Sequence, residues 1–468
     1  MTSVNCEEIN SVSYLATNSS IKMQIITTLA AIFCLFVSID YSAADWVNHG
    51  GDLTNRRHAG GELLLNPFMV RNFLRLRWRF EAGKDISATP AVANGVVYFP
   101  SWNGFLYAVN AFNGDLIWRQ NLSEITGLRG TGIVANVTVS RSTPTVSSDR
   151  LIIGIYGPAF VIAVSRLNGR LLWSTQIDGR PRAVITASGT VHSGAFYVGV
   201  SSLEVGLPAG ECCTFRGSVV KLNLQTGTII WQTYMLPDNG GKLGGYAGAA
   251  VWGSSPAIDI FRGHVYVATG NLYIAPKEVL ECQEKQNNQT TRPTHPDQCI
   301  GPDVNFNSIV ALDLDSGRIQ LNRQLGGYDV FYFVCLIPNN PDCPPGPNLD
   351  ADFGAAPMLL TISVNGTSRD AVAAAQKSGF VWCLDRDNGR ILWSKKAGPG
   401  GLEGGGQWGA ATDGRRVYTN IVNSNREKFT LKPMTQTTTA GAWVALDANS
   451  GAILWSTANP TTTPPMAL

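Results

Sequence analysis

The segment that decides the fold is Val161-Ile-Ala-Val-Ser-Arg-Leu-Asn-Gly-Arg-Leu-Leu-Trp173, because its pattern recurs along the chain. An apolar run leads into a polar-Gly pair, and a second apolar run follows and ends in Trp. The polar-Gly pair is typical of a hairpin turn, where glycine readily adopts a positive φ. The flanking runs are therefore predicted strands, and the closing Trp is suited to packing one sheet against the next.

Six copies of this pattern occur, and five of them end in Trp. They lie at residues 106–118, 161–173, 219–231, 309–321, 381–393 and 443–455. A second recurring segment lies between copies, as in Thr89-Pro-Ala-Val-Ala-Asn-Gly-Val-Val-Tyr98, and adds a further hairpin. Together the two segments predict four strands per unit. Repeated four-stranded units indicate an all-β protein with a β-propeller fold, and the hairpin turns favour it over a solenoid.

The repeat pattern does not by itself give the number of blades. Residues 74–80 contain Trp78 and are predicted to be one more terminal strand, so seven blade ends are expected. After Trp455 the sequence ends at Leu468. An open propeller would expose edge strands, so we expect either a ring of fewer blades or a C-terminally shortened chain.

Residues 1–44 are predicted to lie outside the propeller. Lys22 and Met23 precede an apolar run at 25–37 and the small residues 42–44, which is the layout of a secretory signal with its start at Met23. The alternative is a signal anchor that stays in the membrane. No other stretch is long and apolar enough to span a bilayer, so residues 45–468 are predicted to form one secreted, extracellular domain without a stable membrane span.

The cysteines fit an oxidising compartment. Cys282 and Cys299 bracket one polar loop and Cys335 and Cys343 another, so a disulfide in each would close an insertion. Cys383 is left over and is expected to be buried. Four glycosylation sequons, which also fit a secreted chain, begin at Asn121, Asn136, Asn288 and Asn365.

Composition and missing motifs exclude several functions. The chain is 44% hydrophobic and 15% charged, which excludes intrinsic disorder. A net charge of +2 offers no basic surface for nucleic acid. Five scattered histidines predict no zinc site, and no Cys-x-x-Cys-His motif for covalent haem occurs. The Gly-rich residues 400–406 lack the Lys-Ser/Thr pair of a phosphate-binding loop.

Four motifs carry a resemblance to a known family. They are Cys212-Cys213-Thr-Phe-Arg-Gly-Ser218, Val267-Ala-Thr-Gly-Asn271, Asp350-Ala-Asp-Phe-Gly-Ala-Ala-Pro357 and Gln376-Lys-Ser-Gly-Phe-Val-Trp-Cys-Leu-Asp385. From about residue 46 to 455, the chain resembles the pyrroloquinoline quinone (PQQ) alcohol dehydrogenases, especially the polyvinyl-alcohol-dehydrogenase-like branch. The resemblance implies an eight-bladed quinoprotein propeller that lacks its last blade here. It also implies oxidation of an alcohol, with polymeric and secondary alcohols as candidate substrates and with electrons passing to a separate acceptor.

The same resemblance implies a site with PQQ and Ca²⁺. By local motif, Glu204, Asn271 and Asp329 match the Ca²⁺ ligands, and hard oxygen donors suit that ion. Asp329 also falls near the family's catalytic base, which would take the alcohol proton. Lys377 matches a cation that would hydrogen-bond the quinone oxygens and stabilise developing charge.

Further residues match the walls around the cofactor. The resemblance implies a vicinal disulfide between Cys212 and Cys213 over one face of PQQ and Trp252 over the other. Arg141 and Thr186 match contacts to the carboxylates of the cofactor. The two cysteines could also pair elsewhere or stay free.

Every one of these residues has an ordinary structural alternative. Asp329 and Glu204 could be solvated loop carboxylates, Asn271 and Lys377 turn residues, and Trp252 a docking side chain. The rival function is a non-catalytic secreted propeller that binds a protein or a glycan. The matched site residues favour the enzyme.

Overall fold

The computed structural model describes residues 45–62, 65–253, 255–286 and 295–460. The chain divides into two units, residues 1–44 and 45–468, and all described residues belong to the second. The predicted leader and the sequon at Asn288 therefore lie outside the described residues. None of the helices described is long and apolar enough to cross a membrane.

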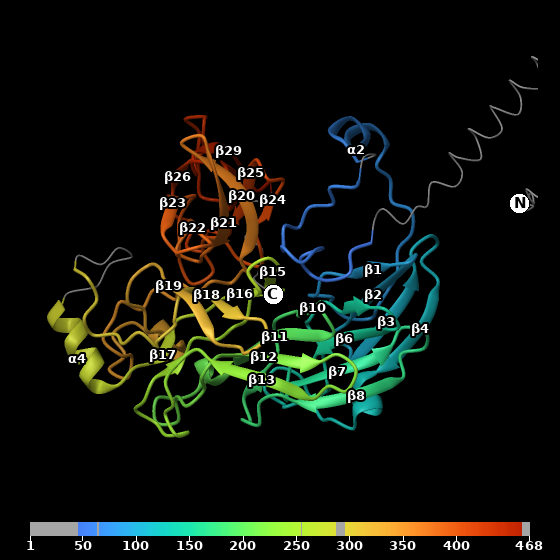
Figure 1. The fold of residues 1–468 in the computed structure, drawn as a ribbon, viewed down its shortest axis with the longest axis horizontal. Helices are drawn as coiled ribbons and strands as arrows, with labels where there is room; N and C mark the ends of the chain where they lie inside the picture. The colour runs from blue at the N-terminus through green and yellow to red at the C-terminus, as the bar shows by residue number, and fades with distance from the viewer. Residues whose placement is uncertain (1–44, 63–64, 254, 287–294, 461–468) are drawn as a thin grey trace, which may run out of the picture. The chain divides into compact units, whose positions relative to one another are not determined.

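Six antiparallel sheets, each a row of four strands joined mostly by hairpins, make up the described part of the fold (Figure 1). Their strands are β1 Ala91–Ala93, β2 Val96–Pro100, β3 Phe105–Asn110 and β4 Leu116–Asn121; β5 Thr145–Ser147, β6 Arg150–Gly154, β7 Phe160–Ser165 and β8 Leu171–Gln176; β10 Thr190–His192, β11 Ala195–Ser202, β12 Ser218–Asn223 and β13 Ile229–Tyr234; β15 Ala257–Asp259, β16 His264–Ala268, β18 Ser308–Asp313 and β19 Ile319–Gln324; β20 Met358–Val364, β21 Thr367–Ala375, β22 Phe380–Asp385 and β23 Ile391–Lys396; and β24 Ala411–Thr412, β25 Arg416–Ile421, β28 Ala442–Asp447 and β29 Ile453–Ala458. We number these sheets one to six in chain order. The all-β prediction is confirmed.

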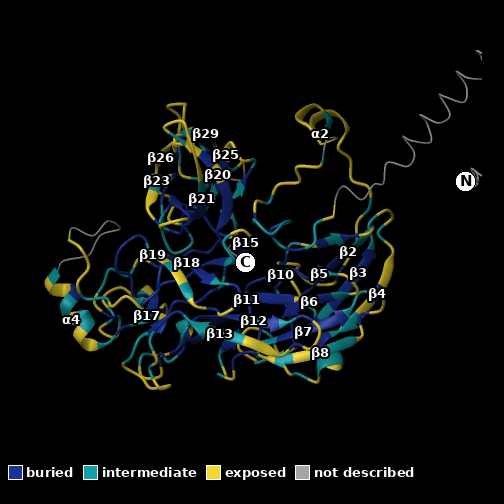
Figure 2. Ribbon diagram, in the orientation of Figure 1, coloured by how far each residue is buried: buried dark blue, intermediate teal, exposed yellow. Residues whose placement is uncertain are grey.

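The remaining elements decorate these sheets. They are β9 Ala183–Val184, which pairs with β11, the strand pairs β14 Ala247–Gly248 with β17 Leu272–Ile274 and β26 Phe429–Thr430 with β27 Thr437–Thr438, the helices α2 Pro67–Phe73, α3 Leu122–Thr126 and α4 Lys277–Gln286, and the 3₁₀ turns η2 Glu204–Gly206 and η3 Phe333–Leu336. Figure 2 shows the middle strands of the sheets buried, whereas outer strands such as β13 and β19 carry exposed positions.

The repeated Gly and Trp join neighbouring sheets. Trp118 of the first sheet donates its indole N–H to Arg166 O in the last turn of the second sheet, at 2.9 Å. Gly169 in that turn has a φ of 70°, and a Cβ there would lie 2.8 Å from Trp118 Cζ3. The glycine is therefore required both for its backbone conformation and for the approach of the indole. Trp173, Trp231 and Trp393 bond the next sheet in the same way.

Four-stranded meanders packed in series through such contacts are the blades of a β-propeller. Residues 74–80 do not form the predicted strand, because no described strand pairs with them. Trp78 nevertheless donates to Ala111 O and packs against Gly114, as the docking pattern predicts. The blade count of eight stays a prediction.

An extended N-terminal segment, residues 45–57, runs along the innermost strands of five sheets. Its backbone is hydrogen-bonded to one residue in each of β1, β5, β15, β20 and β24. The bonds join Trp46 to Val92, Val47 to Val146, Leu53 to Ile258, Thr54 to Leu359 and Arg56 to Thr412. The segment thus ties together blades that are distant in sequence.

The predicted disulfides of the insertions are present. Cys282 pairs with Cys299, and Cys335 pairs with Cys343. Cys383 is free and buried, as predicted. The first disulfide joins α4 to the segment that leads to β18 of the fourth sheet.

Candidate functional site

A cavity of about 270 Å³ lies where loops from several blades converge. The strands explain this convergence: the first two strands of a blade are antiparallel, so the start of the first lies beside the end of the second. Residues before β5, β10, β15, β20 and β24 therefore meet residues that follow β11, β16 and β21. The polar and aromatic residues of the lining include Arg141, Tyr156, Thr186, Trp252, Asn271, Tyr273, Asp350, Asp352, Lys377 and Trp408.

Lys377 and two carboxylates form the charged centre of this cavity. Lys377 Nζ lies 2.9 Å from Asp350 Oδ2 and 3.0 Å from Asp352 Oδ2, and all three side chains are buried. Burial disfavours the ammonium, but the charges of Asp352 and Asp350 outweigh it and raise the pKa of Lys377. Burial raises the pKa of Asp350 against the attraction of Lys377. The centre therefore holds a fixed cation beside two carboxylates.

Asn271 presents an amide to the same cavity. Its Nδ2 donates to Leu272 O at 2.7 Å and to Phe331 O at 2.8 Å. Its backbone N–H donates to Asp352 Oδ1 at 2.5 Å. Because both donors of the amide nitrogen are directed at carbonyls, the free acceptor of Asn271 is its Oδ1.

Glu204 lies just behind the lining, between Leu203 and Val205, which both line the cavity. It is buried, and Thr214 and Phe215 donate backbone N–H groups to its Oε2 at 2.6 and 2.8 Å. Glu204 is therefore an anchored carboxylate and not a solvated loop residue.

Tyr273 shows that the carboxylates share one neighbourhood. Burial raises the pKa of its hydroxyl well above the ordinary value, and the charges of Asp352, Glu204 and Asp350 raise it further. Tyr273 also lines the cavity. Three acidic side chains therefore lie close enough to act electrostatically on one buried hydroxyl.

Aromatic rings form the walls. Trp252 and Trp408 meet edge to face, with ring centroids 5.4 Å apart, and Lys377 Nζ lies 5.3 Å from a Trp252 ring centroid. The Arg141 guanidinium lies 4.8 Å from a Trp408 ring centroid, and burial lowers the pKa of Arg141. Thr186 Oγ1 donates to Trp252 O at 3.4 Å. Flat rings with a nearby cation suit a planar, anionic ligand.

Cys212 and Cys213 form a disulfide with each other. Both residues are buried in a hydrophobic cluster against which Trp252 packs. Cys213 precedes Thr214, which holds Glu204, so the disulfide is linked to the anchored carboxylate. The vicinal pairing is present, although neither cysteine belongs to the cavity lining.

Asp329 lies outside the lining of the cavity. It is fully buried, and its carboxylate accepts bonds from Asn307 Nδ2 and from the backbone N–H groups of Leu349, Asp350 and Ala351. Burial raises its pKa to about 6. It does not line the cavity, because its oxygens are turned toward the loop that carries Asp350. Its structural role is to brace that loop.

Five of the nine site residues predicted from the sequence line the cavity: Arg141, Thr186, Trp252, Asn271 and Lys377. Glu204, Cys212, Cys213 and Asp329 do not. The sequence analysis predicted no role for Asp350, Asp352, Tyr273 or Trp408. The signal for the two aspartates was present, because they open one of the motifs that carried the resemblance. Trp408 lies at a φ of 65°, which is an uncommon conformation for a bulky residue. No sequence pattern marks it.

The residues fit the predicted cofactors in chemistry. Asn271 Oδ1 and the carboxylates of Glu204, Asp350 and Asp352 supply oxygen donors only, which suits Ca²⁺ better than zinc. Among the described residues, no group of three or more His, Cys, Asp or Glu side chains is arranged as a metal cluster. A Ca²⁺ ion would therefore depend on the Asn271 amide as well as the carboxylates. Trp252 and Arg141 match a flat carboxylated quinone.

The fold and the site together define a quinoprotein-type propeller. Residues 75–323 match the profile of a family described as outer membrane protein assembly factor BamB, and residues 347–399 match that of the glucose/ethanol/alcohol dehydrogenase β-propeller domain. The chain belongs to this PQQ-type β-propeller family.

Two polyvinylalcohol dehydrogenases are among the proteins that are similar to this chain. The chain is 29% identical over 397 residues to a polyvinylalcohol dehydrogenase of Pseudomonas sp, covering 82% of this chain and 56% of that protein. It is 27% identical to the polyvinylalcohol dehydrogenase of Sphingopyxis sp., covering 82% and 55%. The chain thus spans little more than half the length of these relatives.

Solved structures support the fold. The quinohemoprotein alcohol dehydrogenase of Comamonas testosteroni superposes with a TM-score of 0.62 at 20% identity, covering 90% of this chain and 68% of that one. A europium-containing methanol dehydrogenase gives a TM-score of 0.61 at 16% identity, covering 90% and 80%. These likenesses concern the fold alone.

Proposed function

We propose that this propeller belongs to a secreted alcohol dehydrogenase that uses PQQ and Ca²⁺ and passes electrons to a separate acceptor. The observation that carries the proposal is the buried set of Lys377, Asp350 and Asp352 in a cavity walled by Trp252. Three relatives of the chain have names that describe them as alcohol dehydrogenases, and two of these names specify a polymeric alcohol.

Bound PQQ would supply the two-electron acceptor for the alcohol carbon, and Ca²⁺ the Lewis acid beside it. Trp252 would cover one face of the quinone, and Arg141 would pair with its carboxylates. Glu204, Asn271 and the two cavity aspartates would hold the ion.

The residues of the chain also offer a base for the hydroxyl proton. We assign the base that takes the hydroxyl proton to Asp350, since its carboxylate faces the cavity and Asp329 is occupied by four donors. Lys377 keeps Asp350 and Asp352 oriented and offers positive charge next to the reacting atoms. Trp252 and Trp408 form an aromatic wall beside that centre.

The first test is a titration with PQQ in the presence of Ca²⁺, in which binding is monitored as quenching of tryptophan fluorescence. The second is dye-linked oxidation of a panel of alcohols. We expect saturable binding that Lys377→Gln weakens at least about tenfold. Lys395→Gln, an exposed lysine on β23, is the matched control and should bind as the unaltered chain does. Absence of saturable PQQ binding would favour the rival, a non-catalytic propeller.

A further inference from the structure

The junction between the fourth and fifth sheets lacks the tryptophan that joins the other neighbours. Leu321 occupies the docking position, and a Cβ on Gly389 of the next turn would lie 3.2 Å from its side chain. Leucine is smaller than tryptophan and has no N–H to donate. This junction is therefore packed differently from those made by Trp118, Trp173 and Trp231.

Ion pairs take over part of the docking role there. Arg386 in the turn of the fifth sheet pairs with Asp259 of β15 at 2.7 Å, and both side chains are buried. Arg262 of the fourth sheet pairs with Asp370 of β21 at 3.0 Å. The two blades are thus held together without an indole between them.

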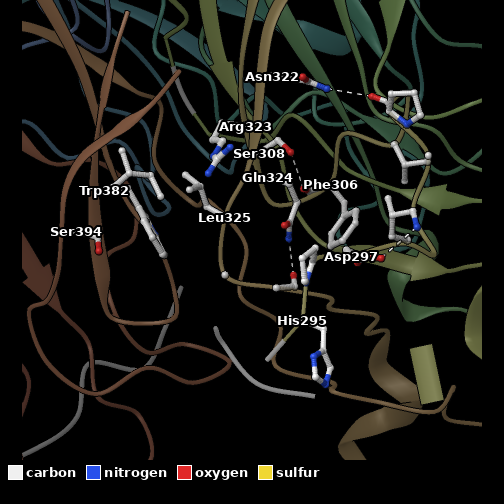
Figure 3. A pocket seen from close by; sticks show the side chains of 18 residues that line it. His295, Asp297, Phe306, Ser308, Asn322, Arg323, Gln324, Leu325, Trp382 and Ser394 are labelled. Atoms are coloured by element: carbon white, nitrogen blue, oxygen red, sulfur yellow. Dashed lines mark hydrogen bonds between the residues drawn. The ribbon is translucent and has the colours of Figure 1, made fainter. Parts of the chain in front are cut away.

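A cavity of about 920 Å³ opens between the same two blades. Figure 3 shows Trp382 and Ser394 of the fifth sheet across from Arg323, Gln324 and Leu325 of the fourth. Its volume is several times the 270 Å³ of the cavity that holds Lys377. We call it the inter-blade groove.

Polar groups in the groove have bonding capacity to spare. Asn322 uses its Nδ2 on Pro302 O and Asn305 Oδ1, and Gln324 uses its Nε2 on Gly327 O, so both amide oxygens remain as acceptors. Arg323 is exposed and makes no ion pair with another residue of the described chain. Ser394 adds a hydroxyl. Hydrogen-bond donors and acceptors are therefore present on the two sides of the groove.

The charges favour a neutral ligand. Arg323 and Asp297 both line the groove, and Asp297 accepts bonds from Gln283 Nε2 and from the N–H groups of Cys299 and Ile300. An anion would meet Asp297, and a cation would meet Arg323. Hydroxyl groups both donate and accept, so they match the donors and acceptors of the groove, and Ile391, which is 40% exposed, supplies apolar surface for a carbon backbone.

The groove is linked to the candidate active site through two consecutive residues. Gln376 donates its Nε2 to Leu325 O at 3.3 Å and accepts from Trp382 Nε1 at 3.0 Å, so it holds both walls of the groove. The next residue is Lys377, which donates to Asp350 and Asp352. The groove and the candidate active site are therefore joined through Gln376 and Lys377.

We propose that the inter-blade groove binds a neutral, hydroxyl-bearing polymer chain at a position separate from the active-site cavity. The polymer's role as substrate rests on the proposed function, whereas its binding does not. In that role the groove retains a polymeric alcohol while one of its units is oxidised.

The experiment is native affinity electrophoresis of the full chain in gels that contain polyvinyl alcohol, dextran or anionic polyacrylate. We expect at least one neutral polymer to retard the protein in a concentration-dependent manner, and the retarding polymer identifies the source. Ser394→Trp, which fills the groove, should raise the apparent Kd at least fivefold. Arg323→Ala, an exposed change without a described ion pair, should weaken binding in the same direction.

The matched control is Ser174→Trp, because Ser174 follows Trp173 on β8 as Ser394 follows Trp393 on β23. It should be retarded like the unaltered chain. Retardation by polyacrylate alone, no retardation by any polymer, or equal retardation of Ser394→Trp would overturn the proposal. If the unaltered chain binds the polymer but shows no PQQ-linked activity, that result would count against the proposed function and not against polymer binding in the groove.

Discussion

Lys377 Nζ donates to Asp350 Oδ2 at 2.9 Å, and both groups are buried in the same cavity. Asp329, in contrast, accepts a bond from the backbone N–H of Asp350 and is turned away from that cavity. The two aspartates thus have different roles, one directed at a ligand and the other at the loop that carries it.

This difference predicts opposite phenotypes for two conservative substitutions. Asp350→Asn should lower kcat at least about 100-fold with little loss of stability, because it removes the base. Asp329→Asn should lower the free energy of unfolding by about 2 kcal/mol, because an amide N–H would face backbone donors, and should leave kcat close to normal. Dye-linked kinetics and urea unfolding measure the two effects. A larger kcat loss from Asp329→Asn than from Asp350→Asn would return the base to Asp329.

The contact between Gly169 and Trp118 predicts a stability difference between two glycines. Gly169→Ala should cost about 2–4 kcal/mol, because its Cβ would meet the indole as well as strain a φ of 70°. Gly194→Ala is the control, since its φ is 74° but no atom lies within 4 Å of the added Cβ. It should cost about 1 kcal/mol, from the backbone alone. Equal shifts in the thermal midpoint would show that the indole does not dock on Gly169.

The ion pairs at the junction of sheets four and five predict a third effect. Arg386→Met should destabilise the fold by about 3 kcal/mol, because it leaves Asp259 buried with one partner fewer. Arg416→Met breaks the more exposed pair with Asp413 and should change stability by less than about 1 kcal/mol. The measurement is the midpoint of thermal unfolding of both variants. Similar small decreases in the two midpoints would mean that Arg386 does not hold the junction and that packing of Leu321 is sufficient.

The sequence predicted the blades because their signal is local. In each repeat, one Gly and one Trp are required by a turn and by a contact that recurs at fixed spacing, so the pattern survives without knowledge of the fold. The segment around Trp78 shows the limit, since its docking was predicted correctly but its pairing was not. Strand formation needs a partner that lies elsewhere in the chain.

The site was harder to predict because loops from distant blades build it. Asp329 and Asp350 share one loop, and only the direction of backbone N–H groups decides which carboxylate faces the cavity. The segment 45–57 gave no signal either, since it is fixed by backbone bonds to five sheets and needs no side-chain periodicity.

That segment carries His49, whose titration predicts how stability depends on pH. Burial and the charge of Arg57 lower the pKa of His49 to about 3, and the ring lies 3.4 Å from Trp408 O. The folded state therefore binds fewer protons than the unfolded state between pH 3 and the ordinary value of 6.5. The contribution of His49 to the free energy of unfolding is therefore complete above pH 6.5 and is lost as the pH falls below 6.5.

His49→Gln should accordingly reduce the acid sensitivity of the fold. Between pH 7.5 and 5, the free energy of unfolding of the variant should fall by less than that of the unaltered chain, with a difference of at most about 2 kcal/mol. His58→Gln, an exposed substitution in the same region, is the control and should leave the pH profile unchanged. Urea unfolding at the two pH values measures the difference. Parallel pH profiles for His49→Gln and the unaltered chain would mean that His49 becomes protonated in the folded state, where its Nε2–H would donate a hydrogen bond to Trp408 O.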